Sequence, residues 1–143
     1  MIQAKLFFCS DSAALDGRYN TISAFHILED LNAPTFPIVI PRLAVIAMFS
    51  RAEADPSNVD LQLQILLGPQ QLFATPVPLS FVQQLHARTI LEMNGFVVPS
   101  PGSLVFALRN GETLIGSWAI RVNQIGQPAV QLNLPQPVAP GQN

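Results

Sequence analysis

The sequence predicts an all-β protein, a two-layer antiparallel β-sandwich of about eight strands with an immunoglobulin-like architecture. Thirteen prolines and eight glycines divide the chain into segments too short for a helical bundle. Between them, apolar and polar residues alternate with the period of two that is typical of a half-exposed strand. Packing two sheets is the simplest way to bury one face of each, and a closed barrel is the alternative.

The first two expected strands, residues 2–9 and 20–28, are predicted to form a hairpin. The segment between them is polar and contains Asp16-Gly17, a dipeptide typical of tight turns.

The middle of the chain supplies further strands. Residues 38–50 are apolar almost throughout, which predicts a central strand with Pro41 at its entry or at a bulge. Residues 59–65 alternate strictly, and residues 70–76 and 86–94 form two weaker strands. The buried face of the alternating strand is expected to comprise Val59, Leu61, Leu63 and Ile65.

Residues 80–86 leave two interpretations open. Ser80 and Gln83 have the spacing of a capping box, which would begin one helical turn. The alternative is an ordinary loop.

A second hairpin is expected near the end of the domain. Residues 104–109 and 114–122 alternate on either side of Asn110-Gly111, which is typical of a type I′ turn with positive φ at both turn residues. The inward faces of these two strands are expected to comprise Leu104, Phe106 and Leu108 on the first and Leu114, Gly116, Trp118, Ile120 and Val122 on the second.

Residues 1–123 are therefore expected to form one β-sandwich domain, and residues 124–143 a Pro/Gln-rich C-terminal tail. Within the tail, Val130, Leu132 and Leu134 alternate as in a strand. They could cover a sheet edge of this domain or of a neighbour, and an extended tail lying on the surface is the alternative.

The composition excludes several classes of protein. Charged residues are 11% of the chain and the net charge is -2, which gives too weak a positive field to hold nucleic acid. No stretch reaches the roughly 18 apolar residues of a membrane-spanning helix, so no membrane role is expected. Because Cys9 is the single cysteine and no signal peptide is recognisable, a reducing compartment, the cytoplasm, is predicted.

Several segments of the chain are familiar in their order and spacing. They are residues 13–14, 22–25, 33–41, 94–99 and 101–108. In this order they resemble a bacterial family of small β-sandwich proteins known only as a domain of unknown function, over about residues 2–122. The resemblance implies a cytoplasmic bacterial or phage-borne protein and assigns no catalytic residue.

No catalytic, cofactor-binding or transition-metal site is expected. Cys9, His26 and His86 are the only residues of the thiol and imidazole types, and their spacing matches no ligand or nucleophile motif. Cys9 lies in phase with Lys5 and is interpreted as an ordinary buried thiol, His26 as a core or rim histidine and His86 as solvated.

A calcium site between loops is the metal-binding alternative. The loops expected at one end of the sandwich carry carboxylates that could coordinate calcium, namely Asp11, Asp16, Glu53, Asp55, Asp60 and Glu112. Arg18 and Arg51 lie among them and no Asp-x-Asp ladder occurs, so solvated loop charges are the preferred interpretation.

The opposite end is expected to carry apolar loops. Its members are Leu31, Phe36, Pro37, Phe96, Val97 and Pro99. Such a cluster is either a plug that closes the sandwich or a contact surface for a partner.

The leading hypothesis is a non-catalytic β-sandwich interaction or assembly module that binds a protein partner or itself, with no cofactor. The alternative is a small-ligand or calcium-binding sandwich, or an enzyme whose site has no recognisable motif.

Overall fold

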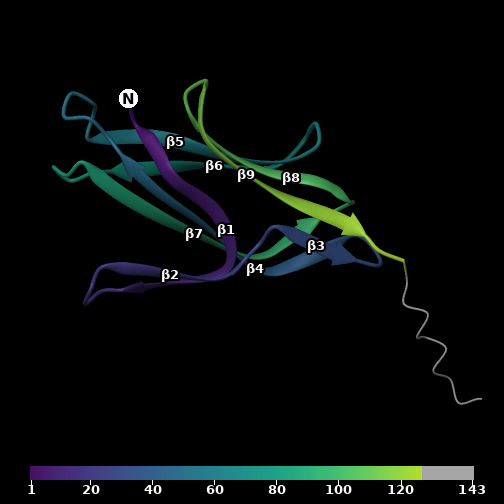
Figure 1. Ribbon diagram of the computed structural model, residues 1–143. Helices are drawn as coiled ribbons and strands as arrows, with labels where there is room; N and C mark the ends of the chain where they lie inside the picture. The colour runs from purple at the N-terminus through teal and green to yellow at the C-terminus, as the bar shows by residue number, and fades with distance from the viewer. Residues whose placement is uncertain (127–143) are drawn as a thin grey trace, which may run out of the picture.

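The computed structural model describes residues 1–126 and is built of strands and their connecting turns (Figure 1). The strands are β1 (Gln3–Asp16), β2 (Thr21–Ile27), β3 (Asp30–Ala33), β4 (Ile38–Ser50), β5 (Asn58–Leu67), β6 (Gln70–Ser80), β7 (His86–Val98), β8 (Gly102–Asn110) and β9 (Thr113–Gln124). Within this part of the chain, no helix is long and apolar enough to cross a bilayer.

The strands form two sheets. One has the order β2-β1-β4-β7 and the other β3-β9-β8-β5-β6. Neighbours pair antiparallel, except that the short β3 runs parallel to β9. The predicted two-layer β-sandwich is therefore confirmed.

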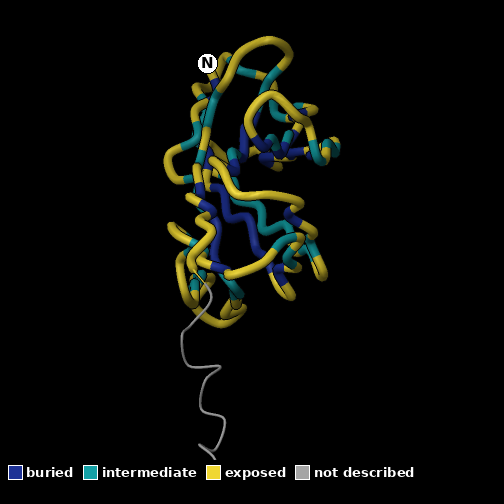
Figure 2. Tube along the Cα trace, turned by 90° about the vertical axis from the view of Figure 1, so that its right-hand side faces the viewer, coloured by how far each residue is buried: buried dark blue, intermediate teal, exposed yellow. Residues whose placement is uncertain are grey.

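The main core lies between the two sheets (Figure 2). Strict alternation in β5 places Leu61, Leu63 and Ile65 in this core, as predicted, because successive side chains of a strand point to opposite faces. Phe106 and Leu108 of β8 fill it from the neighbouring strand. The interior is thus built from the period-two pattern of the sequence.

The outer face of the first sheet is also partly buried. In β4, Leu43 and Val45 face the main core, so Ala44 and Ile46 must point the other way. Nevertheless both are only 1% exposed. This explains why β4 is apolar almost throughout, as a strand covered on both faces must be.

The β1–β2 hairpin covers that outer face. β1 follows β4 as far as the pair Ser10–Ala44 and then pairs with β2 instead. At the far tip of the hairpin, Arg88 of β7 donates to the backbone oxygen of Asn20 at 2.6 Å and also to its side-chain oxygen. The hairpin therefore folds back toward β7, the strand at the other end of the same sheet. The hairpin lies at the bottom of Figure 1.

The structure corrects several expected bounds. The hairpin of the first two strands is confirmed, but β1 continues to Asp16 rather than ending near residue 9. β7 likewise runs to Val98 rather than to residue 94. β3 was expected to be loop, because a four-residue parallel strand is too short to show a period.

Of the two interpretations left open for residues 80–86, the helical turn is absent and the loop is observed. Val82 and Gln83 both have positive φ, 47° and 63°, which a right-handed helix does not allow. A hydrogen bond from Gln84 N to the oxygen of Phe81, 3.0 Å long, closes a turn instead.

The C-terminal hairpin forms with a different turn from the one predicted. Asn110 pairs with Thr113, so the turn residues are Gly111 and Glu112, and of these only Gly111 has positive φ, 61°. A register shift next to Arg109 then turns Leu114 outward, where it is 50% exposed. The prediction that Leu114 faces inward is wrong, because a bulge reverses the alternation that the sequence implies.

Candidate functional site

The predicted apolar end divides into two groups of residues. Leu31, Phe36 and Phe96 are half-buried and pack against the main core, whereas Pro37, Val97 and Pro99 are exposed. The first group has the contacts expected of a plug, and the second faces solvent.

Val97 has an exposed partner that the sequence did not single out. It lies directly opposite Val39 in the β4–β7 register, and the two side chains are 51% and 58% exposed. Two β-branched residues that face each other across strands form one small apolar patch. We call this pair, together with Pro37 and Pro99, the valine patch. The predicted tail contacts, Val130, Leu132 and Leu134, lie outside the described residues.

The thiol and imidazole groups show no catalytic arrangement. Cys9 is fully buried, and this burial raises the pKa of its thiol, so the nucleophilic thiolate is scarce at neutral pH. His26 is exposed and has a positive φ of 58°, so the expectation that it lies in the core or at its rim is wrong. The left-handed backbone there breaks the alternation on which that expectation rested.

The carboxylates of the expected calcium site are dispersed. In residues 1–126, no three His, Cys, Asp or Glu side chains come together as metal ligands would. Asp11 pairs with Arg42 at 3.1 Å. Because β1 extends past its expected end, Asp11 belongs to a strand and not to the loop that was expected to hold it.

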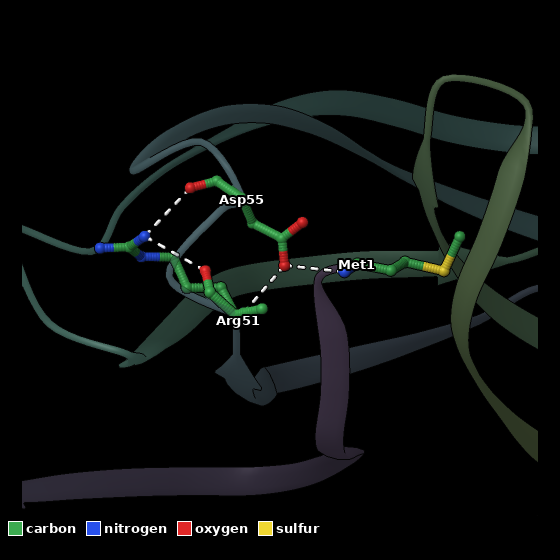
Figure 3. Close-up of polar contacts among 4 residues, drawn as sticks. Met1, Arg51 and Asp55 are labelled. Carbon is green, nitrogen blue, oxygen red and sulfur yellow. Dashed lines mark hydrogen bonds and ion pairs between the residues drawn. The ribbon is translucent and has the colours of Figure 1, made fainter.

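Asp55, in the loop between β4 and β5, forms polar contacts with Met1, Arg51 and Ala52 (Figure 3). Its Oδ2 accepts hydrogen bonds from the amino group of Met1 and from the N–H of Ala52, each 2.8 Å long. The hydrogen bond from the amino group, followed by that from Ala52, lowers the pKa of Asp55 below its ordinary value. Arg51 completes the cluster by donating to the backbone oxygens of Asp55 (3.0 Å) and Gln84 (2.9 Å).

A pocket of about 450 Å³ opens where the tip of the β1–β2 hairpin meets the loop between β6 and β7. We call it the tip pocket. Its lining residues are Lys5, Asn20, Met48, Phe49, Ser80, Phe81, Val82, Gln84, His86, Ala87 and Arg88. The predicted solvated His86 is exposed and lies at this pocket.

A β-bulge accounts for the presence of Lys5 in the tip pocket. Ala4 pairs with Phe49 and Leu6 with Met48, which leaves Lys5 without a partner on β4. Regular alternation would have placed Lys5 in phase with the buried Cys9, as the sequence suggested. The bulge instead brings Lys5 to the same pocket as Met48. No periodic signal in the sequence could have revealed this.

The free edge of β2 is the other feature that sequence analysis missed. β2 ends its sheet and contains neither proline nor a charged residue. Phe25 and Ile27 are 50% and 53% exposed. The sequence predicts that β1 and β2 pair, but it does not indicate that β2 has no second neighbour and ends its sheet.

Comparison with solved structures finds an immunoglobulin-like protein from Pseudomonas aeruginosa. It is 11% identical, with a TM-score of 0.45, and the match covers 85% of this chain and 96% of that one. At this level of similarity nothing about function is carried across. No curated protein matches. A family model described as "Family of unknown function (DUF6941)" matches residues 5–123, nearly the whole range of the expected resemblance. The chain therefore belongs to this family of unknown function.

Proposed function

We propose that the protein is a non-catalytic β-sandwich interaction module that assembles with a second copy of itself through β2. The observation that carries the proposal is the unprotected edge of this strand. Its seven residues, Thr21–Ile27, include no proline and no charge. Natural sheets normally block such edges, because unpaired N–H and C=O groups recruit further strands.

The other three edges differ from β2 in this respect. β6 carries Pro76 and Pro78, which cannot donate to a neighbouring strand. β3 is only four residues long and holds Asp30 in an ion pair with Arg121. β7 carries Arg88 and Glu92. Of the four strands that end the two sheets, β2 is the one without such protection, which supports it as a site for pairing.

A second copy suits this edge by symmetry and by charge. Two antiparallel β2 strands related by a twofold axis present the same residues to each other, so the contact closes without leaving a β2 edge unpaired. β2 contains no Lys, Arg, Asp or Glu, so no fixed like charges oppose the approach of the two strands. The exposed Phe25 and Ile27 then lose contact with water, which stabilises the dimer.

The test introduces a charge into β2 and measures the molar mass of the protein by size-exclusion chromatography with light scattering. The protein is loaded at several micromolar concentrations. We expect a dimer for the wild type and a monomer for Phe25→Lys. Leu114→Lys is the matched control, since Leu114 is equally exposed but lies on β9 in the other sheet. A monomeric wild type, or equal dissociation of the two variants, would overturn the proposal.

The valine patch is proposed as a second protein contact, one that binds a partner with an apolar surface. The paired exposure of Val39 and Val97 supports this assignment. Val39→Asp with Val97→Asp tests it better than charges at Phe36 and Phe96, because the latter two pack against the core and charges there would destabilise the domain. Loss of a partner captured by the wild type, at unchanged melting temperature, is the expected result. Equal capture by the variant would exclude the patch.

The cytoplasm is the proposed location. The single, fully buried cysteine supports it, because such a domain gains nothing from an oxidising compartment. A tagged chain expressed in its host and followed by cell fractionation tests this, and recovery outside the cytoplasmic fraction would contradict it.

A further inference from the structure

We propose that the tip pocket binds a small organic anion, a carboxylate or phosphate group on a compact apolar body, with Lys5 and Arg88 as its charged contacts. This inference is independent of dimer formation through β2.

The charge of the lining selects for an anion. Lys5 and Arg88 are both cationic, and the residues that line the tip pocket include no carboxylate. Within residues 1–126, Lys5 forms no ion pair or side-chain hydrogen bond, in contrast to Arg42 and Arg121, which are paired with aspartates. Two cations without a counter-charge in one concave site create a positive potential that favours a negative ligand.

Arg88 is held in place by the hairpin tip. Two of its N–H groups are engaged by the backbone and side-chain oxygens of Asn20. A guanidinium group has five N–H donors, so this arrangement orients the group while leaving donors for a ligand oxygen. The contact bridges 68 residues of sequence, and so the pocket exists only when the hairpin is folded back against β7.

The rest of the lining suits an apolar body. Met48 and Val82 are exposed at the pocket, and the buried Phe49 and Phe81 lie behind them. A volume of about 450 Å³ lies within the range of small-molecule sites. A ligand the size of a substituted benzene ring with one anionic group therefore matches both the volume and the chemistry.

Arg51 does not line the tip pocket but contacts two residues that do. Its guanidinium lies 5.4 Å from the ring centroid of Phe81 and donates to the oxygen of Gln84 at 2.9 Å. Both contacted residues line the pocket, so the loop between β6 and β7 is positioned before a ligand arrives. Such preorganisation reduces the entropy lost on binding.

The experiment uses the full chain and four probes, titrated while amide chemical shifts are followed by NMR. Phenyl phosphate and benzoate combine an anion with an apolar ring, inorganic phosphate provides the anion alone, and benzyl alcohol provides the ring without charge. We expect saturable shifts at Lys5 and in residues 80–88 with one or both of the combined probes, and weaker binding of inorganic phosphate and benzyl alcohol. If phenyl phosphate binds more tightly than benzoate, the group recognised is a phosphate, and the reverse order identifies a carboxylate.

Lys5→Gln removes one charge from an exposed side chain, and Arg42→Gln is its matched control on the same sheet outside the pocket. Lys5→Gln should weaken binding of the tighter probe about tenfold, the usual effect of losing one charge-assisted hydrogen bond, and Arg42→Gln should not. Absence of saturable shifts, equal binding by Lys5→Gln, or equal weakening by Arg42→Gln would overturn the proposal. Repeating the titration on Phe25→Lys shows whether ligand binding at the tip pocket depends on the proposed β2 dimer.

Discussion

The indole N–H of Trp118 donates a hydrogen bond of 2.8 Å to the backbone oxygen of Leu28. This contact joins β9 to the segment that follows β2, and the Trp118 ring also meets Phe8 edge to face at 6.2 Å. Trp118 is half-buried rather than fully buried as its phase in the sequence implied. Trp118 of β9 thus contacts Phe8 of β1 in the other sheet and Leu28 just after β2, and we expect these contacts to stabilise the domain.

Replacing Trp118 should separate these two contributions. Trp118→Phe keeps a ring next to Phe8 but leaves the oxygen of Leu28 unpaired, and we expect a loss of about 1 kcal/mol in the free energy of unfolding. Trp118→Ala should cost about 3 kcal/mol, the lower end for a large aromatic residue, because the site is only half-buried. Urea unfolding measures both, with the exposed Ser117→Ala as control. Equal stability of Trp118→Phe and wild type would show that the hydrogen bond contributes nothing.

The ion pair of Asp55 predicts a dependence of stability on pH. Because the folded state lowers the pKa of this carboxyl group, its contribution is present above the ordinary value of 3.8 and is lost as the pH falls through the lowered value. The melting temperatures of wild type and Asp55→Asn should therefore differ at neutral pH and converge in acid. A difference that stays constant from neutral pH to the acid limit would show that Asp55 acts without its charge.

Cys9 should be unreactive in the native protein. Its thiol is fully buried and the pKa is raised, so both access and thiolate are lacking. Ellman's reagent should label it only after denaturation, and at intermediate urea the labelling rate should follow the unfolded fraction. Rapid labelling without denaturant would mean that β1 opens locally around this residue.

Calcium should leave the melting temperature nearly unchanged. Asp11 and Asp55 are engaged by cationic groups, and residues 1–126 contain no cluster of three or more ligand side chains. Differential scanning fluorimetry with millimolar calcium, compared with sodium chloride of equal ionic strength, measures the shift. A rise of several degrees that Asp16→Ala or Asp55→Ala removes would revive the calcium-binding alternative.

The sequence predicted those parts of the fold in which side-chain period and burial agree. β5 is the clearest example, because Leu61, Leu63 and Ile65 alternate without interruption and all face the core. The predictions were wrong where backbone irregularities reverse the alternation, as at Leu114 and His26. A bulge depends on the partner strand, so one strand's pattern cannot reveal it.

The candidate sites were less accessible to sequence analysis than the fold. Lys5 and Arg88 are 83 positions apart in the sequence, and they line one pocket only because a bulge redirects the first and the hairpin folds back over the second. No motif encodes such a combination. Val97 was expected in the apolar loop end, as part of a plug or of a contact surface, whereas its partner Val39 was assigned to a buried strand.

The folded-back hairpin gives the protein a second, smaller interior that can open while the main core stays closed. Ala44 and Ile46 belong to this interior, and polar contacts of Arg88 with Asn20 join the tip of the hairpin to β7. Amide hydrogen exchange should therefore show a subglobal unit, in which Thr21–Ile27 exchanges by local unfolding and β5 and β8 exchange only by global unfolding. Such an opening would destroy the tip pocket and expose Ile46 together. A ligand bound at the pocket would then slow exchange in β2, a strand that includes none of its lining residues.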